Sequence, residues 1–201
     1  SLALFIILSG FSGLRTFSYS LLDASDPDLK ITSVKGKSFL LDDDFLQVLD
    51  DNPNIATYAK VIEERVFLEY GDKNEVAFVK GVDTNYANVT KIDDAIYIGD
   101  WLDTTYTNTA VIGRAIAIKL SLGVNSYGRP LTVMIPKPGK GFINPNNAFY
   151  KMDVQVLGLY TGTEEFENKF VYVTLNQAKE LLKYQENQVT ALELKITDIS
   201  S

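Results

Sequence analysis

The feature that most constrains the fold is a strand–helix–strand pattern that occurs twice, once at each end of the chain. Its strands show alternating apolar residues, and its helices carry one apolar stripe. The predicted elements are, in order, Asp28–Val34, Asp43–Asp50 and Ile55–Tyr70, and then Met152–Tyr160, Leu175–Tyr184 and Thr190–Thr197. Because each unit must bury its apolar faces, we expect an α+β fold in which the four strands share one sheet and both helices cover one face of that sheet.

Local signals support these boundaries. The acidic run Asp42–Asp44 precedes an apolar periodic segment, which is typical of a capped helix start. A turn at Gly71–Asn74 separates Ile55–Tyr70 from a further strand over Glu75–Val82, so the two strands are predicted to form a hairpin. Glu63 and Glu64 are adjacent on the first strand, and we therefore expect them to point to opposite faces.

The composition excludes several kinds of chemistry. The 201 residues contain no histidine and no cysteine, so a Ser-His-Asp triad, a cysteine nucleophile and a histidine or cysteine metal site are impossible. We expect no catalytic residues, no cofactor and no metal. The formal net charge of −7 also argues against nucleic acid as a partner.

The amino-terminal segment is strongly apolar. Leu2–Leu8 contains only apolar residues, and small residues follow it, among them Gly10 and Gly13. The helical pattern extends to about Leu22, where an Asp- and Pro-containing stretch ends it. The segment is either the last turns of a membrane helix or a buried helix of a soluble domain, and the sequence leaves both open.

Charge is distributed unevenly along the chain. The stretch from Thr104 to Met152 contains no Asp or Glu, whereas the remainder is strongly acidic. Its basic residues are Arg114, Lys119, Arg129, Lys137, Lys140 and Lys151. This stretch either neutralises an acidic part of the same fold or forms a basic face for an acidic partner.

A long irregular segment, Pro136–Phe149, lies within that basic stretch and is rich in Pro and Gly. We expect it to project into solvent, either as a partner-binding loop or as an ordinary mobile loop. An apolar centre with a charged rim is the typical layout of a small binding hot spot. The candidate binding residues are Lys137, Pro138, Lys140, Phe142, Ile143 and Pro145.

Segments from Leu8–Arg15 and Asp26–Ile31 to Val189–Asp198 resemble, in their order, landmarks of the extracytoplasmic domain of LolC/LolE-type lipoprotein-releasing ABC transporter permeases, with related domains in MacB and FtsX. The resemblance begins at Leu8–Arg15 and Asp26–Ile31. Further landmarks are Val79–Asp83, Ile98–Asp100, Val111–Arg114, Leu120–Gly123, Val156–Gly162, Phe170–Leu182 and Val189–Asp198. Their order and spacing extend over nearly the whole chain.

The resemblance implies a two-part periplasmic domain. A Porter-like split β-α-β/β-α-β layer would comprise residues 23–75 and 150–201, and a mostly-β Sabre-like subdomain, 76–149, would be inserted in it. Residues 1–22 would be the end of the first membrane helix and its extension.

The resemblance also implies a role in transport at the inner membrane, with this domain facing the periplasm and anchored through flanking helices. A separate cytoplasmic ATPase subunit and a partner permease would drive it, and it would release lipoproteins to a LolA-like carrier. The carrier-capturing hook of the LolC family maps onto Pro136–Phe149. Alternatives within the family are MacB-type efflux and FtsX-like signalling.

Two further functions are compatible with the residues alone. One is a surface binding module without flanking membrane helices. The other is a carboxylate-based hydrolase, which would need two carboxyl groups roughly 5–9 Å apart in a cleft. The candidate acids are Asp93, Asp94, Asp100, Asp103, Glu164, Glu165 and Glu167.

Overall fold

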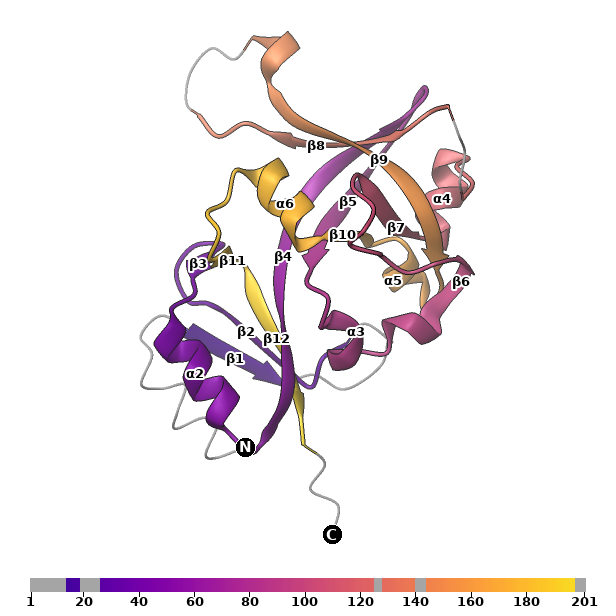
Figure 1. Ribbon diagram of the computed structural model, residues 1–201. Coiled ribbons are helices and arrows are strands. Elements are labelled where there is room, and N and C mark those ends of the chain that lie inside the picture. The colour runs from indigo at the N-terminus through magenta and orange to yellow at the C-terminus, as the bar shows by residue number, and fades with distance from the viewer. Residues whose placement is uncertain (1–13, 19–25, 125–127, 140–143, 198–201) are drawn as a thin grey trace.

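The computed structural model describes residues 14–18, 26–124, 128–139 and 144–197, the first of these ranges by its backbone alone. Within this part of the chain, ten strands form one sheet in the order β1-β2-β12-β4-β5-β10-β7-β9-β6, and β8 pairs with both β4 and β9. A second sheet joins only β3 and β11. Short helices cover the main sheet (Figure 1), which confirms the predicted α+β class.

The strands are β1 (Leu14–Ser18), β2 (Leu29–Ser33), β3 (Phe39–Leu40), β4 (Ile55–Tyr70), β5 (Lys73–Val82), β6 (Ile96–Gly99), β7 (Thr109–Gly113), β8 (Leu131–Pro136), β9 (Phe149–Tyr160), β10 (Phe170–Thr174), β11 (Gln188–Val189) and β12 (Ala191–Ile196). The helices are α2 (Asp43–Asp51), α3 (Tyr86–Val89), α4 (Arg114–Leu120), α5 (Glu164–Glu167) and α6 (Leu175–Leu182), with 3₁₀ turns η1 (Ile92–Ala95) and η2 (Pro145–Asn147).

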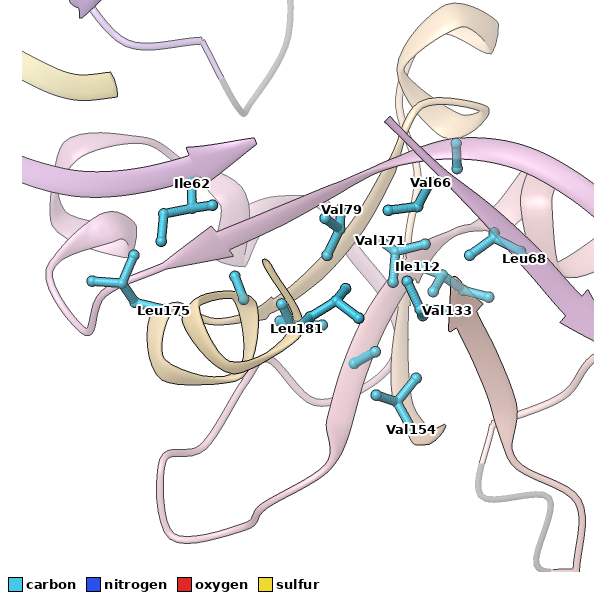
Figure 2. Packing of buried hydrophobic residues seen from close by; sticks show 14 of the residues in the cluster. Ile62, Val66, Leu68, Val79, Ile112, Val133, Val154, Val171, Leu175 and Leu181 are labelled. Atoms are coloured by element: carbon cyan, nitrogen blue, oxygen red, sulfur yellow. The ribbon is translucent and has the colours of Figure 1, made fainter. Parts of the chain in front are cut away.

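Part of the sheet closes on itself. β4 pairs with β5, β5 with β10, β10 with β7, β7 with β9, β9 with β8, and β8 again with β4. The apolar side chains inside this ring form the main core together with α6, and Figure 2 shows Val66, Val133, Val154, Val171 and Leu181 packed together. Closure leaves the ring strands with neighbours on both sides, which removes sheet edges there.

Strand β4 connects the ring to the strands near the chain ends. Its first part, Ile55–Val61, pairs with β12, and its second part, Val61–Tyr70, pairs with β5. β2 and β12 therefore lie at the opposite end of the molecule from the loop between β8 and β9 (Figure 1). The four strands predicted to share a sheet do so, although β9 reaches β4 only through β8 or through β7, β10 and β5.

The starts of α2 and α6 are each capped by a side chain, and the cap at Asp42 was predicted. Asp42 Oδ1 accepts a hydrogen bond from the Phe45 N–H at 2.6 Å, and Thr174 Oγ1 accepts one from the Gln177 N–H at 3.3 Å. Each bond satisfies a donor that the helix leaves free. Phe45 of α2 and Leu181 of α6 belong to the same apolar cluster, as a common face for the two helices requires.

The predicted helix up to about Leu22 is wrong at Leu14–Ser18, which forms strand β1 and pairs antiparallel with all of β2. Thr and Phe in this segment favour extended backbone, and pairing supplies β2 with a second neighbour. The expected helix over Leu2–Leu8 lies outside the described residues. Among the residues described, no helix is long and apolar enough to span a bilayer.

Candidate partner-binding hairpin

The hairpin β8–β9 carries the loop for which binding was predicted. Its pairing runs from Leu131 opposite Val154 to Pro136 opposite Phe149, and the Lys137 N–H donates to the Ala148 carbonyl at 2.9 Å. The described part of the loop beyond Lys137 consists of exposed residues up to Asn147, followed by the half-buried Ala148. This described part of the loop therefore projects from the sheet, and it lies at the end of the molecule opposite β2 and β12 (Figure 1).

Three of the six candidate residues lie in the described part of the chain. Pro138 and Pro145 are exposed, whereas Lys137 is half-buried. The Lys137 ammonium donates to Asn147 and lies 5.3 Å from the centre of the Tyr150 ring, so this lysine is held against the hairpin. The other three candidates, Lys140, Phe142 and Ile143, lie outside the described residues.

Further cationic side chains near the β8–β9 hairpin lie over the faces of tyrosine side chains. Lys183 is 5.3 Å from the centre of the same Tyr150 ring, and the Arg129 guanidinium is 5.7 Å from that of Tyr70. A cation over an aromatic face keeps its full charge. These contacts leave positive charge on the surface near the hairpin.

An exposed apolar surface at the base of the hairpin was missed by the sequence reasoning. Phe67 on β4 lies opposite Val76 on β5 and Met134 on β8, and its ring meets Phe149 edge-on with the centroids 6.1 Å apart. Phe67 is 40% exposed and Val76 43%. The available signal was the consecutive apolar run Val66–Leu68, because alternation on a strand places its middle residue on the opposite face from its two neighbours.

Two ion pairs lie farther along β4, on the same face as Phe67. The Lys80 ammonium is 2.9 Å from one Glu193 carboxylate oxygen and donates to the other at 3.1 Å, while Lys30 donates to Glu63 at 3.3 Å. The register places Lys30 opposite Glu193 and Glu63 opposite Lys80. Each ion pair therefore joins two strands that are not neighbours: Lys30–Glu63 joins β2 to β4 over β12, and Lys80–Glu193 joins β5 to β12 over β4.

Lys80 is buried among aromatic rings. Its ammonium lies 4.8 Å from the Phe170 ring centre and 5.2 Å from that of Tyr86, which also contacts Tyr172. Burial alone would lower the pKa of Lys80, but the Glu193 carboxylate outweighs this effect, so the pKa is raised well above its ordinary value. The charged form of Lys80 is therefore favoured, as its ion pair with Glu193 requires.

Two of the acids considered for a hydrolase, Glu167 and Asp103, have local hydrogen bonds that give them other roles. Glu167 is buried, and its carboxylate accepts hydrogen bonds from the Thr161 hydroxyl and the Gly162 N–H. Hydrogen bonds from the Thr105 N–H and hydroxyl lower the pKa of the exposed Asp103, whereas a general acid needs a raised one. In the described ranges, no group of three acidic residues is placed to hold a metal ion.

Comparisons with known proteins agree with this architecture. The sequence model of the MacB-like periplasmic core domain matches residues 2–200. The lipoprotein-releasing system transmembrane protein LolE of Haemophilus influenzae is 26% identical over 153 residues, which are 75% of this chain and 35% of that protein. The chain thus spans about a third of the length of this curated relative.

Two solved structures share the fold. The extracellular domain of the noncanonic ABC-type transporter YknZ from Gram-positive bacteria gives a TM-score of 0.58 at 13% identity, covering 93% of this chain and 83% of that one. The periplasmic region of MacB from Actinobacillus actinomycetemcomitans gives 0.56 at 13% identity, covering 96% and 78%. Matched over almost its whole length, the chain belongs to the family of MacB-like periplasmic core domains.

Proposed function

We propose that this chain is the periplasmic domain of an ABC transporter permease that releases lipoproteins from the inner membrane to a soluble carrier. Membership of the MacB-like family supports the transporter class, and the LolE relative supports lipoprotein as the cargo. In this proposal a separate cytoplasmic subunit hydrolyses ATP, a second permease completes the transporter, and helices flanking the domain anchor it in the membrane.

The proposed division into parts follows the family resemblance. Residues 23–75 and 150–201 form the Porter-like part, and residues 76–149 form the inserted Sabre-like part. The position of β4, which pairs with β12 along its first half and with ring strands along its second, supports mechanical continuity between them. A shift of the strands near the chain ends would thereby reach the β8–β9 hairpin.

The observation that carries the proposal is the projecting β8–β9 loop. Its exposed Pro138 and Pro145 stiffen the backbone, and Phe142 with Ile143 supplies an apolar anchor. The Lys137 and Lys140 charges would steer an acidic carrier toward the loop. The surface cations over Tyr150 and Tyr70 support the interpretation of the basic stretch as a partner face.

The test is a titration of this chain with the LolA-like periplasmic carrier from the same organism. Phe142→Ala should weaken binding without changing the melting temperature, since the described loop residues on either side of this position are exposed. Lys137→Glu combined with Lys140→Glu should lower the association rate and abolish its salt dependence. Ile118→Ala, which truncates a 64% exposed apolar residue on α4, is the matched control and should bind as the wild type does.

Equal binding by all variants would overturn the loop as the binding element. If even the wild-type chain fails to bind the carrier, lipoprotein handover fails as well. An efflux role of the MacB type or an FtsX-like signalling role would then replace it, and both keep the transporter-domain assignment.

A further inference from the structure

The outer face of strand β4 has a self-complementary arrangement of side chains. Arg65, Phe67 and Glu69 alternate with buried residues, and all three are exposed. The apolar centre of this face therefore has a positive charge on one side along the strand and a negative charge on the other. We name these three residues the β4 outer triad.

Neighbouring strands widen the apolar centre without covering it. Val76 lies opposite Phe67 on one side and Met134 on the other, and Phe149 packs edge-on against the Phe67 ring. Val76 and Phe67 are each about two-fifths exposed, at 43% and 40%. Exposed aromatic and apolar side chains at the centre of a polar surface are typical of interaction sites.

From this arrangement we infer that the outer face of β4 and its neighbours binds the same face of a second copy of this chain. A twofold axis that lies in the interface and crosses β4 at Phe67 makes the two strands run in opposite directions, face to face. Arg65 of each copy then meets Glu69 of the other, and the two Phe67 rings meet at the axis. Such an interface uses one surface patch twice, as twofold dimers do.

Charge complementarity selects this occupant over others. Neither charge of the triad has a partner in a salt bridge among the described residues, and the register keeps them four residues apart on one strand face. An all-acidic or all-basic partner would meet one like charge, which opposes binding. The same face on a second copy satisfies both charges at once. Apart from Phe149, which ends the Pro136–Phe149 segment, this surface is distinct from the loop residues assigned above, so the inference does not depend on carrier binding.

The test is sedimentation velocity of the 201-residue chain over a range of concentrations. The wild type should associate to a dimer, and the association should weaken as salt screens the Arg65–Glu69 contacts. Arg65→Glu and Glu69→Arg should each weaken self-association by about tenfold or more, since each places like charges opposite one another. Glu75→Arg, a charge reversal on the neighbouring strand outside the triad, is the matched control and should leave dimerisation as in the wild type.

Complementation separates this interface from non-specific association. The Arg65→Glu chain mixed with the Glu69→Arg chain should form a heterodimer, because both contacts across the axis are then between opposite charges. The double variant in one chain should regain the homodimer for the same reason. A monomeric wild type at its highest soluble concentration would overturn the inference, as would single variants that associate like the wild type or a mixture that stays monomeric.

Discussion

Lys80 and Glu193 form a buried ion pair that passes over strand β4, with the ammonium nitrogen 2.9 Å from a carboxylate oxygen and side-chain exposures of 4% and 1%. The strands that carry them, β5 and β12, do not pair with each other, because β4 lies between them. The contact thus connects a ring strand directly to a strand near the chain end. Removing either partner alone would leave an uncompensated charge in the core.

We therefore expect Lys80→Met to lower the free energy of unfolding by roughly 3–5 kcal/mol, because Glu193 then stays buried without a counter-charge. The double variant Lys80→Met with Glu193→Leu should recover most of that loss, since an apolar pair of similar volume needs no desolvation of charge. Urea unfolding of the four members of this cycle measures both effects. Equal losses in the single and double variants would show that packing contributes more to stability at this site than charge pairing does.

Much of the fold follows from local patterns in the sequence. The strand Ile55–Tyr70 is found with the predicted bounds, and the helix start at Asp42 uses the expected cap. Glu63 and Glu64 point to opposite faces, toward Lys30 and Lys37. Each of these depends on residues close together in the chain, where alternation and capping chemistry act directly.

The missed features depend on residues that are distant in sequence. Lys80 and Glu193 lie 113 positions apart, and neither is the only charged residue on its strand. Only the sheet order brings them together, and no local pattern encodes that order. Strand β1 was missed for the same reason, since its extended form depends on pairing with β2. The exposure of Phe67 likewise depends on which face of β4 the ring encloses.

A second prediction concerns how the free energy of unfolding declines at low pH. Burial alone would raise the pKa of Glu63, but Lys80, Lys30 and Lys169 outweigh it and lower the pKa below its ordinary value of 4.5. A lowered pKa in the folded state gives stability that is present above the ordinary pKa and lost as the pH falls through the folded value. Glu63→Gln should therefore reduce the free energy of unfolding at pH 7 and flatten its decline below about pH 4.5.

Equilibrium unfolding at a series of pH values measures this slope. The matched control is Glu64→Gln, which removes the neighbouring carboxylate from the exposed pair with Lys37. We expect that control to change the free energy of unfolding at pH 7 by less than about 1 kcal/mol. If the free energy of unfolding of Glu63→Gln declines at low pH as steeply as that of the wild type, the assigned role of the Lys30–Glu63 pair is contradicted.

A third prediction concerns the close contact between β5 and α6. A Cβ added at Gly81 would lie 2.3 Å from the Ala178 Cβ, so α6 packs directly against the strand backbone. Gly81→Ala should lower the free energy of unfolding by roughly 1–3 kcal/mol, since such overpacking forces the helix to shift. Ala178→Gly alone should also destabilise, through its helix propensity, by about 1 kcal/mol. The double variant should be more stable than the sum of the two losses predicts, because the second change removes the clash; strict additivity would contradict the contact.

The last prediction concerns the Tyr160 hydroxyl, which fixes the segment between β9 and β10. It donates to the Phe166 carbonyl at 2.8 Å and accepts from the Phe170 N–H at 2.9 Å, in a fully buried setting. Tyr160→Phe keeps the ring and its packing but leaves both backbone groups without this partner. We expect a loss of about 1–3 kcal/mol in the free energy of unfolding, with increased amide hydrogen exchange at Phe170. Tyr97→Phe removes a hydroxyl from a residue that is 58% exposed and should change stability by less than about 0.5 kcal/mol. If the two variants unfold alike, or if exchange at Phe170 is unchanged, the Tyr160 hydroxyl does not hold this segment in place.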